Sequence, residues 1–153
     1  MILENDADRD TEIVDVDALS FSLDGLSKLS EKTMIIDGHY SHELFNTMQV
    51  NLVVVLRKAP WELHDVLQNR LYSYEKVWEN LEAEIMGIIA EEAQEFPVEK
   101  LHEVDTTGKS VQETAEEILE VIRGERPASY GPIDWITYPE TLRVLVNRTC
   151  TLS

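Results

Sequence analysis

The chain has 153 residues, enough for one domain with a sizeable hydrophobic core but too few for two independent domains. Hydrophobic residues make up 43% of the chain, yet no apolar run approaches the roughly 18 residues that a membrane span requires. The formal net charge is −17, from 30 acidic and 13 basic side chains, so most of the surface repels the phosphates of DNA and RNA. Composition thus argues against a membrane protein and against direct DNA binding.

The acidity itself has two interpretations, which the sequence leaves open. It keeps a protein soluble in a salty cytoplasm, or it attracts a basic partner. Residues 1–10 lack the apolar stretch of a signal peptide, and the single cysteine, Cys150, excludes an internal disulfide and a cysteine-based zinc site. We therefore expect a cytoplasmic protein.

In chain order, the mostly polar residues 1–11 are expected to be extended or loose, and two β-rich runs follow. Residues 33–36 predict a short strand that ends at Asp37 and Gly38. Residues 50–56 predict the clearest strand, because their nearly continuous apolar character suits a central strand buried on both faces.

Two helices are expected next. Pro60 at a first helical position and the apolar residues after it predict a helix over 60–70. From Tyr74 onward, apolar residues recur every three or four positions and glutamates occupy the other side, which predicts an amphipathic helix to about Ala93.

The remaining elements follow the same alternation. Residues 101–104 predict a third strand, and Ser110 opens a helix over 111–123, with Glu113 at the capping-box position and Gly124 as its stop. Residues 124–139 are expected to be loose, and beyond Pro139 the pattern fits a strand or a helix equally. Strands alternating with helices predict an α/β fold with a parallel sheet.

Polar residues cluster at the carboxyl ends of the predicted strands, where open α/β sheets bind ligands. At the tip of strand 33–36, the carboxylate of Asp37 could hold Mg²⁺ through water. His39 could orient a water or accept a proton, or it could be an ordinary solvated loop residue. His39 and His42 are also three residues apart, the spacing of two ligands of a shared metal.

The triplet Gly108-Lys109-Ser110 reproduces the end of a phosphate-binding loop ahead of a helix. Position 103, however, is glutamate, so the glycine that lets backbone amides close around phosphate is missing. We therefore assign a turn to Gly108 and helix capping to Ser110.

Several segments taken in order resemble one family, the archaeal and eukaryotic adenylate kinases that include the coilin-interacting nuclear ATPase. The segments are 8–19, Ile35-Ile36-Asp37-Gly38-His39, Val53-Val54-Val55-Leu56-Arg57, 69–80 and Glu103-Val104-Asp105-Thr106-Thr107-Gly108. The resemblance runs from about Asp8 to Trp135. It implies a P-loop kinase fold with a three-layer parallel sheet, a kinase-derived domain over 1–136 with a lid at about 69–80, and a tail of unknown structure at 137–153.

The resemblance also implies roles for single residues. Asp37 and His39 match an Asp-x-His motif, in which Asp37 organises Mg²⁺ through water and His39 supports the attacking group or the conformational step. Arg70 matches the arginine that opens the lid and neutralises ATP phosphate charge, and Asp105 and Thr106 lie near the adenine. Asp15 and Asp17 follow the AMP-binding region, although each could equally be a cap or a solvated turn residue.

The chain departs from the family pattern in two ways. The lid of the family usually reads Arg-Gly-Tyr, where this chain has Arg70-Leu71-Tyr72, and the first strand with its phosphate loop has no counterpart here. The resemblance therefore implies an N-terminally truncated kinase. Because phosphoryl transfer depends on preorganised phosphate contacts, we expect little or no turnover by residues 1–153 alone.

The function implied by the resemblance is conversion of ATP and AMP to two ADP, with an ATPase role in small ribosomal subunit maturation. The alternative is a non-catalytic acidic module that binds a basic ribosomal protein. A small metal-binding protein that uses His39 and His42 is the third interpretation.

Overall fold

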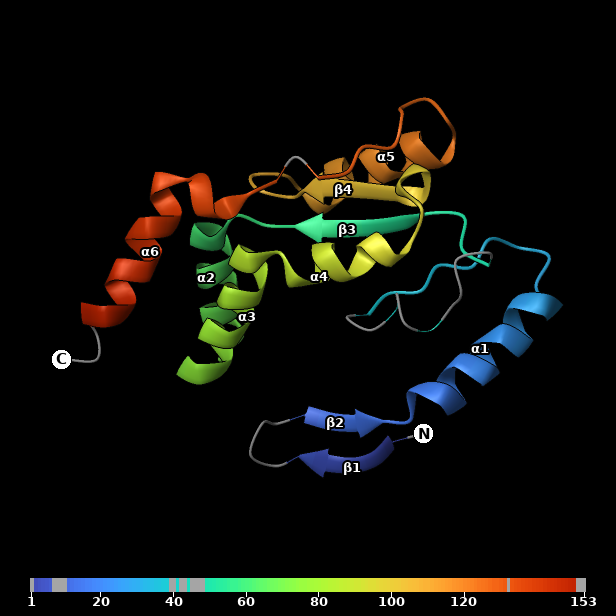
Figure 1. The fold of residues 1–153 in the computed structure, drawn as a ribbon, viewed down its shortest axis with the longest axis horizontal. Coiled ribbons are helices and arrows are strands. Elements are labelled where there is room, and N and C mark those ends of the chain that lie inside the picture. Colours follow the sequence, from blue (N-terminus) through green and yellow to red (C-terminus); the bar gives the residue numbers. More distant parts are fainter. Residues whose placement is uncertain are drawn as a thin grey trace. The chain divides into compact units, whose positions relative to one another are not determined.

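The computed structural model describes residues 2–6, 11–38, 41, 44, 49–131 and 133–150 (Figure 1). The chain divides into two compact units, residues 1–51 and residues 52–153. The second unit contains a small parallel sheet with helices around it, so the predicted α/β class is confirmed. No helix among the described residues combines the length and the hydropathy needed to cross a membrane.

The first unit begins with an antiparallel pair of strands, β1 (Ile2–Asp6) and β2 (Thr11–Val14), followed by α1 (Val16–Leu29). Asp15 is the N-cap of α1, and its carboxylate accepts a hydrogen bond from the backbone N–H of Ala18 at 2.9 Å. Of the two interpretations of Asp15, the structure thus shows the cap. Helix α1 is not among the elements predicted from the sequence, and none of its described side chains is buried.

The predicted strand over residues 33–36 is wrong. The structure assigns no strand to residues 33–37, and Ile35 is 84% exposed. The two described strands of this unit pair with each other and not with this segment. A β-rich run without a neighbouring ladder cannot satisfy its backbone N–H and C=O groups as a strand, whatever its propensity.

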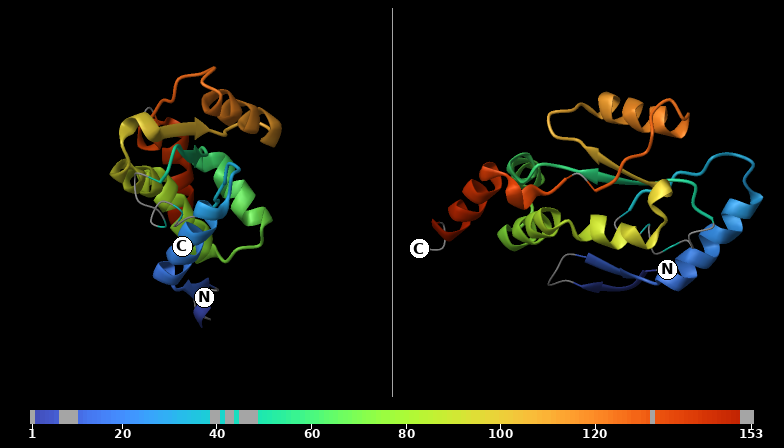
Figure 2. Two further views of the ribbon diagram at one scale, coloured as in Figure 1. Left: turned by 90° about the vertical axis from the view of Figure 1, so that its right-hand side faces the viewer. Right: turned by 45° about the horizontal axis from the view of Figure 1, so that its top comes forward.

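The second unit carries the sheet of the site. Its strands, helices and 3₁₀ turns are β3 (Val53–Arg57), α2 (Pro60–Asn69), α3 (Tyr74–Met86), α4 (Ile88–Glu92), turns at Ala93–Glu95 and Val98–Lys100, β4 (Leu101–Asp105), α5 (Val111–Ile122), a turn at Trp135–Thr137, and α6 (Pro139–Cys150). Strands β3 and β4 pair in parallel, from Val53 opposite Leu101 to Arg57 opposite Asp105. Figures 1 and 2 show α5 beside β4 and α4 beside β3, with α2, α3 and α6 grouped beyond the carboxyl end of β3.

The predicted helix over 74–93 is wrong in one respect, because Gly87 divides it into α3 and α4. Gly87 has a φ of +68°, and its N–H donates to the carbonyls of Ala83 and Glu84, which is a left-handed helix end. A Cβ built on Gly87 would lie 3.6 Å from the guanidinium of Arg57. Such a distance is an ordinary contact, so it is the left-handed backbone at the end of α3 that requires glycine.

The other predicted strands and helices of this unit are confirmed, with shifts of a few residues at their ends. The expectation that the first of these strands is central and buried on both faces is wrong, because β3 pairs only with β4 among the described strands and Leu56 is 55% exposed. Ser110 and Glu113 form the reciprocal capping box at the start of α5, and Gly108 and Gly124 both have positive φ. The segment after Pro139, which fitted either a strand or a helix, is α6. One buried cluster of this unit consists of Leu67, Val77, Trp78 and Leu81, with Leu63, Val144 and Leu145 packed against it. Helices α2, α3 and α6 thus share one core.

Candidate functional site

The carboxyl ends of β3 and β4 lie side by side, and hydrogen bonds join the loops that follow them. The backbone N–H and the hydroxyl of Thr106 both donate to the carbonyl of Arg57 at 2.8 Å. The hydroxyl oxygen of Thr107 accepts from the N–H of Ala59 at 2.9 Å. The two loops therefore form one polar edge of the sheet.

Asp105 and Thr106, to which the family resemblance gives a role in nucleotide binding, lie together in this edge. An oxygen of Asp105 accepts from the N–H of Thr107 at 2.8 Å and closes a tight turn. Since the hydroxyl of Thr106 already donates to Arg57, both side chains shape the turn that a ligand would meet.

Lys58 supplies a cation to the same edge, a residue that the sequence analysis did not assign to the site. Its ammonium donates to Glu62 at 2.8 Å and to the carbonyl of Thr106 at 3.4 Å. Glu62 also accepts from the N–H of Gly108 at 3.1 Å. The hydrogen bond from Lys58, and then the one from Gly108, hold the pKa of Glu62 below its ordinary value. The position of Lys58 just after an apolar strand is the feature of the sequence that could have indicated its place in the site.

Behind this edge lies a buried ionic network centred on Arg57. The guanidinium donates to Glu84 at 2.8 Å and to Glu103 at 2.5 Å, and only 3% of its side chain is exposed. The Nε1 of Trp135 donates to Glu84 at 2.7 Å, and the N–H of Lys58 donates to Glu84 at 3.1 Å. Glu84 thereby links α3, the start of the loop after β3 and the 3₁₀ turn at Trp135–Thr137.

Burial and charge act in opposite directions on this network. For Arg57, burial opposes the charged form, but the charges of Glu84 and Glu103 outweigh it and raise its pKa above the ordinary value. For Glu84, burial dominates and raises the pKa of the carboxyl, although Arg57 and Trp135 favour its charged form. The network therefore keeps a permanent cation beside a carboxylate whose ionisation is opposed by desolvation.

The raised pKa of Glu84 predicts that the free energy of unfolding depends on pH, and Glu84→Gln should remove this dependence. Because the pKa of Glu84 is raised in the folded state, its contribution to stability is fully present below its ordinary pKa of 4.5. That contribution is lost as the pH rises through the raised value. Urea unfolding of both proteins between pH 4 and pH 8 should show the wild type losing free energy of unfolding relative to the glutamine variant as the pH rises. A constant or opposite difference would contradict the shift.

Arg70 lies away from the polar edge. It is the C-cap of α2, it is exposed, and α2 begins at Pro60, directly after the edge. The ten residues of α2 place Arg70 about 15 Å along the helix from that edge, at 1.5 Å per residue. The structure therefore brings Asp105 and Thr106 together but does not bring Arg70 to them.

Leu71 stands where the family pattern has glycine, and its backbone shows why glycine suits the position. Its φ is +59°, the only positive φ of a non-glycine residue that the structure describes, and its side chain is 90% exposed. The left-handed conformation costs an L residue about 1–2 kcal/mol, because Cβ crowds the following carbonyl. Leu71 is therefore strained without gaining burial.

Leu71→Gly is accordingly expected to raise the free energy of unfolding by about 0.5–1 kcal/mol, since glycine relieves this strain but loses more chain entropy on folding. Leu71→Ala is the matched control, because it removes the side chain and keeps the strained Cβ. Urea unfolding should show a gain for glycine alone. Equal stability of the glycine and alanine variants would refute the strain argument.

The remaining predicted site residues belong to the first unit. Asp37 is exposed and follows a segment that is not a strand, so it does not project from a strand tip as expected. His39 and His42 lie outside the described residues. Across the part of the chain that the structure describes, no three His, Cys, Asp or Glu side chains gather as metal ligands do.

No protein-family model matches the chain, but similar proteins are known in archaea. A protein of Thermococcus gammatolerans named "putative adenylate kinase" is 42% identical over 122 residues, which cover 80% of this chain and 65% of that protein. A Methanocaldococcus jannaschii protein of the same name is 34% identical over 132 residues, covering 86% of this chain and 69% of its own length. The chain belongs to this archaeal adenylate kinase family.

A third family member, from Methanosarcina acetivorans, is 35% identical over 146 residues, with 87% of this chain and 75% of that protein covered. The chain spans 65% of the Thermococcus gammatolerans protein and 64% of the corresponding Pyrococcus abyssi protein. The predicted resemblance to adenylate kinases is thereby confirmed at family level. The link to the coilin-interacting nuclear ATPase stays a prediction.

Proposed function

We propose that this chain serves adenylate-kinase-type phosphotransfer, in which ATP and AMP give two ADP. Identity of 34–43% to archaeal proteins named as adenylate kinases carries the proposal. The polar edge at the carboxyl ends of β3 and β4 is consistent with it, because open α/β sheets bind ligands there. Our proposal includes a sheet of the three-layer P-loop type, a kinase-derived region over residues 1–136, a separate tail over residues 137–153 and a cytoplasmic location.

Each residue has a task in this proposal. Asp105 and Thr106 shape the turn that contacts adenine, and Arg70 neutralises ATP phosphate charge when the lid at about 69–80 closes. Asp37 holds Mg²⁺ through water, for which an exposed carboxylate is a suitable hard oxygen donor. Mg²⁺, when bound, neutralises charge on the phosphates. His39 supports the attacking group or the conformational step.

Calorimetric titration of residues 1–153 with Mg²⁺ and ATP tests the nucleotide role. We expect Arg70→Ala to weaken binding about tenfold, the effect of losing one charge-assisted contact of about 1.4 kcal/mol. Arg123→Ala is the matched control, because Arg123 is an exposed C-cap at the end of α5, just as Arg70 is at the end of α2. Binding that is absent, or equally weakened in both variants, would contradict the proposal.

Turnover is a separate expectation. The chain contains no glycine-rich phosphate loop, and positioned phosphate contacts provide most of the catalysis in phosphoryl transfer. A coupled assay with ATP and AMP should therefore show no more activity in residues 1–153 than in their Asp37→Ala variant. Turnover that Asp37→Ala abolishes would show that other residues replace the loop.

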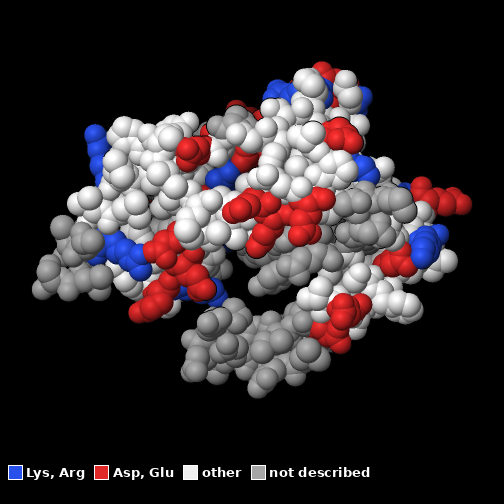
Figure 3. All heavy atoms as spheres, viewed as in Figure 1, with Lys and Arg blue, Asp and Glu red and all other residues white. Residues whose placement is uncertain are grey.

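A second candidate function is favoured by the acidic surface. The net charge is −17, and Figure 3 shows carboxylates gathered over α3 and α4 on the face in view. Such a surface attracts a basic protein. The family resemblance implies that this partner is a basic small-subunit ribosomal protein, and that the chain has an ATPase role in maturation of the small subunit. A pull-down with a purified protein of this kind should weaken steeply with salt. Capture that does not respond to salt or to charge reversal would count against it.

A further inference from the structure

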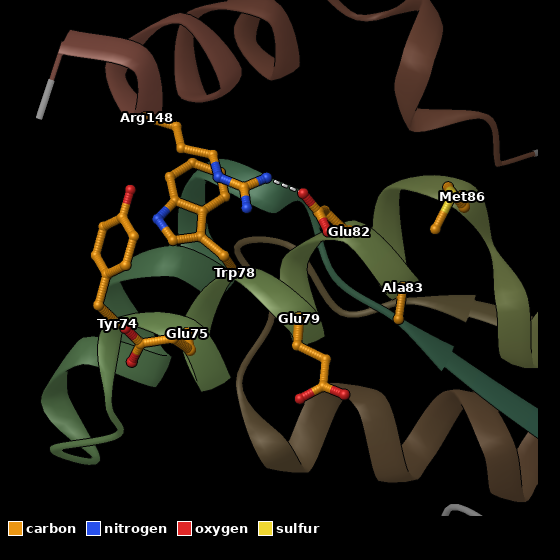
Figure 4. A pocket seen from close by; sticks show the side chains of 8 residues that line it. All are labelled: Tyr74, Glu75, Trp78, Glu79, Glu82, Ala83, Met86 and Arg148. Atoms are coloured by element: carbon orange, nitrogen blue, oxygen red, sulfur yellow. Dashed lines mark hydrogen bonds and ion pairs between the residues drawn. The ribbon is translucent and has the colours of Figure 1, made fainter. Parts of the chain in front are cut away.

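A hollow of about 630 Å³ opens between α3 and the last turns of α6 (Figure 4). It lies outside the polar edge at the strand ends, and four of its lining residues, Tyr74, Glu75, Trp78 and Glu79, belong to the proposed lid at about 69–80. Seven of its eight lining residues lie on α3, and the eighth is Arg148 of α6. The proposed phosphotransfer assigns no contact to these side chains.

Aromatic side chains from α3 line the hollow on one side. The indole of Trp78 is nearly buried, and the ring of Tyr74 lies with its centroid 6.1 Å from that of Trp78. Trp78 also belongs to the buried cluster shared by α2, α3 and α6, so the core holds its ring in place. A rigid aromatic surface of this kind is suited to stacking against a planar cation.

The rim of the hollow is acidic. Glu75, Glu79 and Glu82 all line it, at positions three and four residues apart on α3, and therefore on one face of the helix. Glu75 and Glu79 are exposed. The hollow therefore offers carboxylates beside an aromatic surface, in a protein that is strongly acidic as a whole.

The side chain of Arg148 shows which chemistry the hollow accepts. It reaches in from α6, its guanidinium lies 5.0 Å from the centre of the Trp78 ring, and it is paired with Glu82 (Figure 4). One guanidinium thus already occupies an aromatic and acidic position, while Glu75 and Glu79 line the rest of the rim.

We propose that the hollow binds an arginine-bearing segment of a basic polypeptide. A guanidinium of the partner stacks against the exposed ring of Tyr74 and pairs with Glu79 and Glu75, while the face of Trp78 stays covered by Arg148. Arginine is preferred to lysine because its planar fork stacks on rings and binds carboxylates through two donors. The inference rests on the second candidate function, which gives the class of partner, a basic protein. The acidic rim of the hollow is the reason to place the binding site there.

Fluorescence anisotropy with a labelled peptide tests both the preference for an arginine-bearing partner and the location of its binding site. The probe is a flexible glycine–serine peptide with four arginines, and the matched ligand carries four citrullines, which are neutral and nearly isosteric. The wild type should bind the arginine peptide at least tenfold more tightly, as expected for several charge-assisted contacts. If the two peptides bind equally, the basic-partner function itself fails.

Two double variants then test the location. Glu75→Gln/Glu79→Gln removes two exposed carboxylates from the rim, and Glu116→Gln/Glu125→Gln removes two exposed carboxylates from α5 and the segment after it. Each double variant removes two negative charges, so both change the net charge of the protein equally. The rim variant should lose about tenfold in affinity and the control less than twofold, because only the rim contacts are short-range. Equal losses would place the peptide elsewhere, even though the basic-partner function stands.

Arg148→Gln provides an independent check, because it removes the guanidinium that occupies the hollow. Glu82 and the face of Trp78 then become available to the peptide, so affinity should rise severalfold. Unchanged thermal unfolding would show that the variant is folded. Affinity that falls in a folded Arg148→Gln protein would overturn the inference, since a cationic ligand should gain from losing a competing cation.

Discussion

Arg57→Met is expected to lower the free energy of unfolding by about 3–5 kcal/mol, because it leaves the buried carboxylate of Glu103 and the partly buried carboxylate of Glu84 without their cation. In the folded protein, Arg57 pairs with Glu84 and Glu103, and Trp135 completes the hydrogen bonding of Glu84. Methionine has a similar length but supplies no donor. Both carboxylates would lose the charge that compensates for their desolvation.

Urea unfolding at neutral pH measures this effect, with Arg126→Met as the control. Arg126 also pairs with two glutamates, Glu117 and Glu120, but its side chain is 45% exposed. Exposed pairs contribute about 0–1 kcal/mol, so the control should be nearly as stable as the wild type. Equal losses in the two variants would show that burial does not give the Arg57 network its importance.

Leu81→Ala is the second substitution with a large expected effect, a loss of about 2–5 kcal/mol in the free energy of unfolding. Leu81 is fully buried and belongs to the cluster where α2, α3 and α6 meet. Removing its side chain takes away apolar burial and leaves a cavity that rigid neighbours fill only in part.

Leu142→Ala serves as the matched control for this substitution. Leu142 lies on α6 and is 56% exposed, so the same chemical change should cost about 0.5 kcal/mol or less. Thermal and urea unfolding should show that Leu81→Ala is clearly less stable than Leu142→Ala. A small loss at Leu81 would mean that the three helices do not share the core described above.

The sequence predicts the second unit well where local rules decide the structure. The capping box at Ser110 and Glu113 fixes the start of α5, and the apolar run before Arg57 fixes β3. Amphipathic periodicity continues across Gly87, so the pattern predicts one long helix there. The left-handed backbone of Gly87 shows why α3 ends at this residue.

Residues 33–36 show the limit of propensity in the first unit. Their β-rich composition predicts a strand, but a strand needs a partner, and pairing is not a local property. Helix α1 is a different case, because its apolar residues do recur at helical spacing although none of its described side chains is buried.

The candidate site was predicted in part for a similar reason. Parallel strands end at the same edge of a sheet, so the position of Asp105 and Thr106 beside the loop after β3 follows from the pattern. The Arg57 network did not follow, because its partners are 27 and 46 residues away in the sequence. Lys58 was missed because its role depends on Glu62 and on the turn at Thr106.

The most direct test of the central claim, that the polar edge after β3 and β4 is a nucleotide site, is an NMR titration of backbone amides with Mg²⁺ and ATP. The account predicts shifts of the amide signals of Lys58, Thr106, Thr107 and Gly108, together with Arg70 as the lid closes. Signals that remain unchanged at this edge at millimolar ATP, or that shift only around the hollow between α3 and α6, would contradict it.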